Sequence, residues 1–196
     1  TANCTENGFL RKAILSLKPG EQLKMQWLQL WRSVHNYRDD DSSWSNKYKR
    51  IIFCDNGTSQ YKSDFIHTSR IPGKLKGRRR QIDGPEYGLL HFQFVNWENL
   101  EIKQAWYRHL ERIRLPNKPA GEIMKKYAPS EDETGLVVKP SPREWFAGYS
   151  FFDETLFGEA DEWRRQQMRD WTNAYGSRYF SGLRASSGGS CGTGKR

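Results

Sequence analysis

The chain of 196 residues is long enough for one domain with its own core, and a hydrophobic content of 36% is too high for a disordered chain. It contains no run of about 18 apolar residues that could span a membrane, and three widely separated cysteines support neither a disulfide framework nor a zinc ribbon. A formal charge of +9 favours anionic partners, which could be nucleic acid, phosphorylated metabolites or an acidic membrane face, although a generally basic surface would give the same balance.

The first third of the chain predicts a short helix followed by strands. Apolar residues share one face of residues 6–17, which is typical of an amphipathic helix. Residues 22–32 alternate with the period of two of a half-buried strand, and the alternation slips at Leu28, which predicts a bulge. Residues 51–53 form a further short strand, and residues 61–67 are expected to return antiparallel to it.

Two loops between these strands carry concentrated charge. Residues 33–47 contain Asp39, Asp40 and Asp41, and clustered carboxylates of this kind either chelate a hard cation or form a solvated acidic loop. Residues 70–80 contain six cations and no acid. This second stretch predicts an exposed basic loop, which is either simply solvated or faces a phosphate group.

Residues 87–95 give the strongest strand pattern of the chain. Leu90, Phe92 and Phe94 share one face and are expected to be buried. The opposite face places His91 among apolar residues, so we expect that face to line a cleft. An imidazole in that position binds a metal or a phosphate oxygen, or else it is a hydrogen-bonded residue of the core.

Two helices are predicted after this strand. Asn96 is a candidate cap for the first of them, whose apolar stripe runs through residues 102–113. Lys103 and Tyr107 lie four residues apart and share a face of that helix, an arrangement that suits a diphosphate but also occurs as a plain surface pair. The second helix begins at a proline and covers residues 119–127.

The C-terminal part of the chain changes composition twice. Residues 128–144 are rich in proline, serine and acidic residues, and they are expected to connect to a last amphipathic helix over residues 159–174. From Ser181 onward glycine and serine dominate, which predicts a disordered tail. The sequence therefore predicts one folded domain over residues 1–180 and a tail over residues 181–196.

Four segments together resemble a family 2-type bacterial glycosyltransferase. They are Ser69-Arg70-Ile71-Pro72, Gly88 to Phe94, Asn96-Trp97 and Lys103 to Tyr107. The resemblance covers most of residues 1–157, and it implies an α/β fold with a partial nucleotide-diphospho-sugar transferase-like mixed sheet and flanking helices. In such enzymes an Asp-x-Asp motif ends a strand before a helix like that of residues 6–17. The N-terminal donor-binding half is therefore expected to be missing, and residues 1–180 to be the acceptor-side part.

The resemblance implies an enzyme that moves a sugar from a nucleotide-diphospho-sugar donor to a hydroxyl of an unknown glycan, lipid or protein acceptor. Its implied cofactor is a divalent metal, Mn²⁺ or Mg²⁺, which would act as a Lewis acid on the leaving diphosphate. This chain alone is expected to be inactive, because the carboxylates that hold the donor metal are not in the expected place.

The resemblance also implies roles for individual residues. His91 matches a downstream histidine that often joins the metal or diphosphate shell of such enzymes. The implied substrate-binding residues are Arg70, Trp97, Lys103 and Tyr107. An acidic base would deprotonate the acceptor hydroxyl. The candidates for that catalytic base, by position only, are Asp39, Asp40 and Asp41.

The alternative function is a basic nucleic-acid-binding module without enzymatic activity. The net charge, the cations of residues 74–80 and an aromatic content of 14% favour this alternative. However, most tryptophans and phenylalanines fall on apolar faces and no nucleic-acid motif occurs, so no specific nucleic-acid partner is expected. The cysteine usage fits a reducing cytoplasm, and the charge leaves open a peripheral contact with the inner membrane face.

Overall fold

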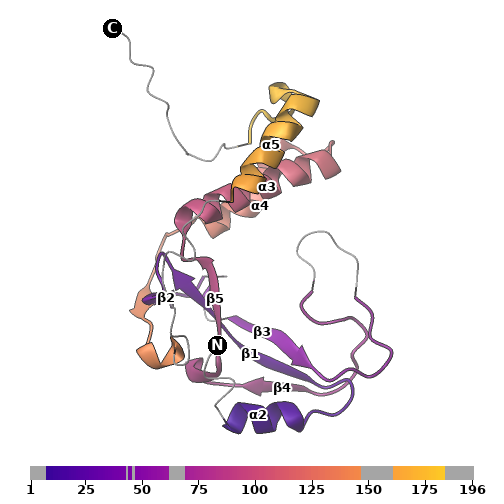
Figure 1. The fold of residues 1–196 in the computed structure, drawn as a ribbon, viewed down its shortest axis with the longest axis vertical. Helices are drawn as coiled ribbons and strands as arrows, with labels where there is room; N and C mark the ends of the chain where they lie inside the picture. The colour runs from indigo at the N-terminus through magenta and orange to yellow at the C-terminus, as the bar shows by residue number, and fades with distance from the viewer. Residues whose placement is uncertain (1–7, 43, 46, 62–68, 147–160, 184–196) are drawn as a thin grey trace. The chain divides into compact units, whose positions relative to one another are not determined.

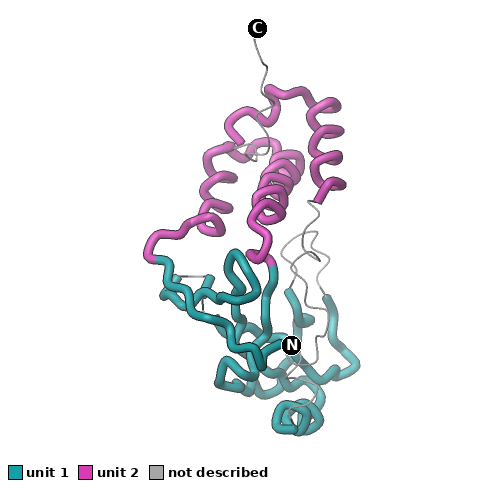
Figure 2. The backbone as a smooth tube through the Cα atoms, turned by 60° about the vertical axis from the view of Figure 1, so that its left-hand side comes forward, with its two compact units in different colours: residues 1–92, 136–152 teal, residues 93–135, 153–196 magenta. Residues whose placement is uncertain are grey.

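The computed structural model is a mixed α/β fold, and it describes residues 8–42, 44–45, 47–61, 69–146 and 161–183 (Figure 1). The chain divides into two compact units (Figure 2). Unit 1 takes its described residues from 1–92 and 136–152, and unit 2 takes them from 93–135 and 153–196. Most of the returning strand predicted over residues 61–67 lies outside the described residues, as do residues 184–196 of the predicted tail.

Unit 1 is built on an open sheet in which β1 (Gln22–Trp31) is the central strand. Four other strands pair with it: β2 (Asn36–Arg38), β3 (Lys47–Phe53), β4 (Arg79–Ile82) and β5 (Leu89–Phe94). β2 and β3 run antiparallel to β1, whereas β4 runs parallel to it. A sixth described strand, β6 (Val138–Pro140), pairs antiparallel with β2. The strands predicted over residues 22–32, 51–53 and 87–95 are therefore confirmed.

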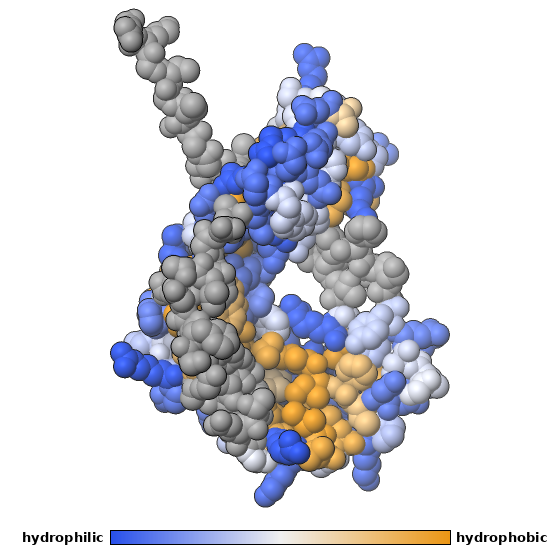
Figure 3. Space-filling view, in the orientation of Figure 1, coloured by the Kyte–Doolittle hydropathy of each residue, from blue (hydrophilic) through white to orange (hydrophobic). Residues whose placement is uncertain are grey.

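One face of β1 forms the apolar core of unit 1. Leu23 and Met25 pack with Leu10, Ala13 and Ile82, because alternate residues of a strand point to the same side. Two of these partners come from α2 (Gly8–Leu15), which confirms a helix within the predicted residues 6–17. α2 covers this face only in part, and Figure 3 shows apolar side chains gathered on the surface of unit 1 in the region of α2 and β3.

The irregularity of β1 lies elsewhere than predicted. The pairing with β3 shifts between Leu23 and Lys24, whereas the sequence predicted a bulge at Leu28. The apparent slip at Leu28 has a different cause, because β1 is buried on both faces from Trp27 to Trp31. A strand that is covered on both sides has no reason to alternate apolar and polar residues.

The start of β4 is held against the start of β1 by a close backbone approach. Gly77 N–H donates a hydrogen bond of 3.1 Å to the Gly20 carbonyl, and Gln22 N–H donates one of 3.0 Å to the Arg78 carbonyl. A Cβ atom on residue 77 would lie 2.4 Å from the Gly20 carbonyl carbon, so only glycine fits there. This approach fixes the position of Arg79, the next residue along β4.

Unit 2 consists of helices. α3 (Trp97–Arg114) packs against α4 (Ala120–Tyr127) and α5 (Glu162–Tyr175), which confirms the three helices predicted after residue 95. The predicted cap is also confirmed, because Asn99 N–H donates a hydrogen bond of 2.9 Å to Asn96 Oδ1. Trp106 Nε1 of α3 donates to Gln167 Oε1 of α5 at 2.6 Å. None of the described helices has both the length and the apolar character needed to cross a lipid bilayer.

A buried carboxylate joins α3 to α4. The side chain of Glu111 is only 4% exposed, and its oxygens accept hydrogen bonds of 2.6 Å from Lys118 Nζ, Lys126 Nζ and the Tyr127 hydroxyl. Burial alone would raise the pKa of Glu111, but these three donors outweigh burial and lower it to about 2. The ionised carboxylate therefore stabilises unit 2.

We predict that Glu111→Gln lowers the free energy of unfolding by about 2 kcal/mol at pH 7, because the substitution removes the charge that the two lysines neutralise. A lowered pKa contributes stability above the unfolded-state value of about 4.3, and this contribution disappears as the pH falls towards the folded value. The difference between the two proteins in urea unfolding should therefore shrink between about pH 4.5 and pH 2. The exposed Glu122→Gln is the matched control and should change stability by less than about 0.5 kcal/mol. A difference that is independent of pH would contradict this account.

Candidate functional site

A pocket of about 420 Å³ opens on unit 1, and we call it the basic pocket. Its lining consists of Lys24, Tyr48, Lys49, Arg50, Ser69, Arg70, Ile71 and Arg79. Five of these eight residues are cations, and among the described residues no carboxylate lines the pocket. The cations come from β1, from β3, from the segment before β4 and from β4 itself. The pocket is therefore a concentrated positive site that four separate parts of the chain assemble.

The pairing of the strands explains why Lys24, Arg50 and Arg79 meet. Lys24 of β1 lies directly opposite Arg50 of β3, and residues opposite each other share a face of the sheet. Gln22 pairs with Arg79 of β4 and points to the same side as Lys24, because the two are separated by one residue. Arg50 Nη1 donates to Gln22 Oε1 at 3.3 Å. The face of the sheet opposite α2 is thus polar and basic.

One carboxylate, that of Asp83, approaches the margin of the basic pocket. It accepts hydrogen bonds from Gln81, at 2.7 Å, and from the Tyr48 hydroxyl, and these bonds lower the pKa of Asp83. The hydrogen bond to Asp83 in turn raises the pKa of Tyr48. Lys24 Nζ lies 5.4 Å from the Tyr48 ring centroid and also acts electrostatically on Asp83. Asp83 therefore offsets part of the charge of Lys24 without lining the pocket.

Arg70 links the basic pocket to a second group of side chains. Its guanidinium carbon lies 4.2 Å from the ring centroid of Trp27, which is only 7% exposed, and the His91 ring lies 4.5 Å from the same tryptophan. His91 Nδ1 is 2.5 Å from Oε1 of the buried Gln29. We call these four residues the Trp27 cluster.

The contact with Gln29 determines the tautomer of His91. An amide oxygen can only accept, so the proton shared in this contact is on His91 Nδ1, and an imidazole that carries no second proton then has its lone pair on Nε2. This assignment uses the amide orientation of Gln29, in which Oε1 faces the ring. The buried Gln29 thus sets the orientation of the His91 imidazole, which explains the polar residue at this position of β5.

The three acidic residues proposed as base candidates differ in their surroundings. Asp40 forms an ion pair with Arg38 Nε at 2.5 Å, and the two side chains are only 5% and 2% exposed. Asp40 also accepts a hydrogen bond of 2.8 Å from Ser42 N–H. Asp39 forms an ion pair with Lys139, and Asp41 is exposed. Asp40 therefore anchors its loop, and the structure does not gather the three carboxylates around a common point.

The other predicted substrate-binding residues belong to unit 2. Trp97 is the first residue of α3. Lys103 Nζ donates to Gln93 Oε1 at 3.2 Å and lies 5.9 Å from the Tyr107 ring centroid, which confirms that Lys103 and Tyr107 share a helix face. The ring of Tyr107 stacks on Tyr127 at 5.9 Å. Of the predicted site residues, only Arg70 and His91 are brought together within unit 1.

The residues around His91 do not fit the divalent metal that the resemblance implied. Within the described part of the chain, no group of three His, Cys, Asp or Glu residues could hold a metal ion. The described contacts of His91 include an indole, an amide and, on the same indole, the guanidinium of Arg70. Mn²⁺ and Mg²⁺ prefer carboxylate oxygens, and a nearby fixed cation opposes their binding.

Sequence analysis missed several residues of this site. The alternation of apolar and polar residues in β1 indicated that Lys24 faces away from the core. Nothing in the sequence showed that Arg50 of β3 lies opposite Lys24. The alternation of residues 22–32 gives no sign of the contact between Trp27 and Arg70, which joins residues 43 positions apart. Gln29 was not considered, because a buried glutamine in a strand has no sequence signature.

We predict that Asp40→Asn lowers the free energy of unfolding by about 3 kcal/mol, because it leaves the buried guanidinium of Arg38 without a carboxylate. Asp41→Asn should change stability by less than about 0.5 kcal/mol, because Asp41 is exposed. Chemical denaturation of the two variants beside the parent chain measures both effects. An Asp40→Asn variant as stable as the parent would show that the ion pair with Arg38 is not structural and would return Asp40 to the candidates for a base.

The geometry described above is the basis for assigning a function, because comparisons with known proteins give none. No protein-family model, no curated protein and no solved structure matches this chain.

Proposed function

We propose that this chain is part of a glycosyltransferase that transfers a sugar from a nucleotide-diphospho-sugar to an acceptor hydroxyl. The observation that carries the proposal is the basic pocket itself, in which Arg70 is shared with the Trp27 cluster. Glycosyl transfer from such a donor releases a nucleoside diphosphate, so negative charge develops on the leaving phosphate oxygens. Cations fixed at that position stabilise the transition state more than the ground state.

Arg70 and His91 have complementary roles in this proposal. The guanidinium of Arg70 can donate two parallel hydrogen bonds to phosphate oxygens, and its contact with Trp27 reduces the number of orientations that it can adopt. His91 Nε2 can accept the proton of the acceptor hydroxyl, because its Nδ1 is fixed as the donor to Gln29. A base for the nucleophile and a cation for the leaving group are the two elements that the reaction requires.

The alternative, a nucleic-acid-binding module, would use the same cations to bind backbone phosphates. Sequence-tolerant binding of single strands also needs exposed aromatic rings on which bases stack. The ring of Trp27, which lies against the Arg70 guanidinium, is 7% exposed and packs against His91, so it offers no free face to a base. The burial of Trp27 therefore favours the transferase.

We predict that His91→Asn reduces turnover about a hundredfold, which corresponds to about 3 kcal/mol of transition-state stabilisation, and leaves the melting temperature unchanged. The asparagine amide can still donate to Gln29, so the buried amide stays paired while the base is lost. The measurement is release of nucleoside diphosphate from a panel of nucleotide-sugars by the full-length product of the gene, together with a thermal melt. The exposed His35→Asn is the matched control and should change neither quantity.

Two results would contradict the proposal. A His91→Asn protein that melts earlier but turns over at the parent rate would show that His91 has only a packing role. No release of nucleoside diphosphate from any donor of the panel, with acceptor sugars, lipids and proteins supplied, would contradict the transferase activity as a whole.

A further inference from the structure

We infer that the basic pocket is a diphosphate site in which side-chain cations hold both phosphate groups without a divalent metal. The inference rests on the proposed function only in taking a nucleoside diphosphate as the natural source of the ligand. The resemblance to a glycosyltransferase implied that a divalent metal neutralises the diphosphate. The structure offers instead five cations that line one pocket of about 420 Å³.

The first argument is that the residues described in the lining do not neutralise the charge of the pocket. Lys24 and Arg50 face each other directly across β1 and β3, and like charges in this position destabilise a sheet. The chain neutralises cations elsewhere, since Arg38 pairs with Asp40. In the basic pocket the one carboxylate at the margin, Asp83, acts on Lys24. An anionic ligand would relieve the repulsion that remains among the other cations.

The second argument concerns the number of phosphate groups. Three of the five cations are arginines, namely Arg50, Arg70 and Arg79, and each comes from a different segment of unit 1. A planar guanidinium binds a phosphate through two parallel hydrogen bonds, and two linked phosphates offer three such groups and Lys24 more oxygens and more negative charge than one phosphate does. The pocket volume lies within the range of small-molecule sites, which leaves room for two linked phosphates.

The third argument concerns the metal. Mg²⁺ and Mn²⁺ are usually held between a phosphate and one or two protein carboxylates. The described lining of the basic pocket contains cations, Tyr48, Ser69 and Ile71, and so it provides no carboxylate for such a bridge. A divalent ion would also be repelled by the neighbouring lysines and arginines. The side chains therefore take the place of the metal in balancing the charge of the ligand.

The test is calorimetric titration of the chain with inorganic pyrophosphate, inorganic phosphate and uridine diphosphate, in buffer that contains EDTA. We expect pyrophosphate and uridine diphosphate to bind in EDTA at least about tenfold more tightly than phosphate, with an affinity that falls as salt is added. Adding excess Mg²⁺ should not strengthen binding. Binding that appears only with Mg²⁺, equal affinities for phosphate and pyrophosphate, or no binding at all would each overturn the inference.

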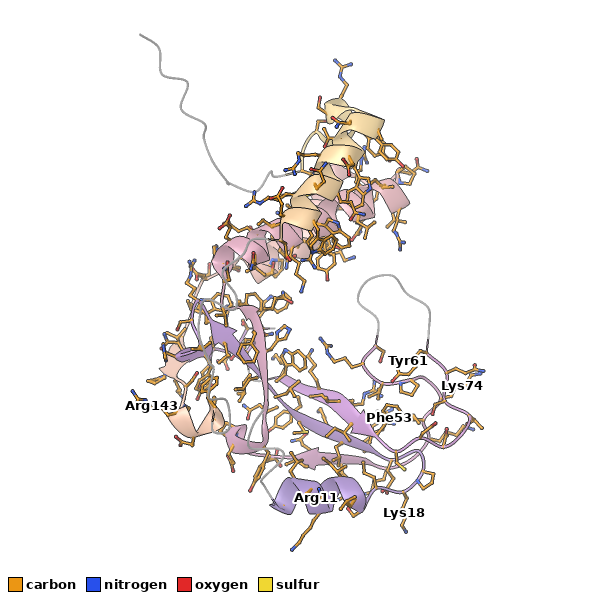
Figure 4. The ribbon with its side chains drawn as sticks, viewed as in Figure 1. Arg11, Lys18, Phe53, Tyr61, Lys74 and Arg143 are labelled. Carbon is orange, nitrogen blue, oxygen red and sulfur yellow. The ribbon has the colours of Figure 1, made fainter. Side chains whose placement is uncertain are left out.

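Single substitutions locate the site. Arg79→Gln and Arg50→Gln should each weaken pyrophosphate binding by about tenfold, and the unliganded Arg79→Gln variant should melt no earlier than the parent, because a source of repulsion is removed. Lys74→Gln is the matched control, since the exposed Lys74 belongs to the same basic stretch as Arg79 but lies at the outer edge of unit 1 (Figure 4). Equal weakening by the control would mean that only diffuse surface charge is involved, which would overturn the inference.

The outcomes separate this inference from the proposed function. Pyrophosphate binding in EDTA without any sugar transfer by the full-length protein supports the site and contradicts the transferase. Transfer that requires a metal, without pyrophosphate binding in EDTA, supports the transferase and overturns the metal-free site. A short single-stranded oligonucleotide that binds more tightly than uridine diphosphate, at the same ionic strength, would assign the pocket to nucleic acid instead.

Discussion

The pairing of four strands with β1 is the constraint on which the rest of unit 1 depends. Because side chains alternate along a strand, packing Leu23 and Met25 under α2 forces Lys24 to the opposite face. A shift of one residue would bury the lysine and expose the leucine, so the apolar core also fixes the register of the neighbouring strands. Lys24 and Arg50 repel each other, and their meeting across β1 and β3 is therefore a consequence of packing on the other side of the sheet.

The buried carboxylates of this protein form ion pairs, whereas the cations of the basic pocket are mostly exposed to solvent. The buried carboxylates of Glu111 and Asp40 are each matched by cations, because an unpaired charge in a buried place would cost several kcal/mol, of the order of 3–5. The described lining of the basic pocket contains no carboxylate to match its cations, and most of these cations are exposed to solvent, where water and salt screen their repulsion. The repulsion therefore lowers the stability of the folded protein only modestly. Any ligand must displace water that solvates these cations.

Local features of the fold could be predicted from the sequence, and contacts between distant residues could not. The cap at Asn96 and the three helices of unit 2 depend on residues a few positions apart, so their patterns are visible in the chain. Arg50 and Arg79 meet only because both of their strands pair with β1, and no pattern gives that register. The three adjacent aspartates made Asp40 a candidate catalytic base. Its ion pair with Arg38 could not be predicted, because the sequence does not show that Arg38 is buried.

The fixed orientation of side chains in the Trp27 cluster helps to distinguish a catalytic site from a surface that only attracts anions. A surface that attracts phosphates by charge alone works with freely moving lysines and arginines. In this protein the guanidinium of Arg70 lies against Trp27, and the proton of His91 is fixed on Nδ1 by the buried Gln29. Both groups are thus oriented by contacts within the protein, before any ligand binds. Fixed donors and bases of this kind are what lower a reaction barrier, because no free energy is then spent on orienting them during the reaction.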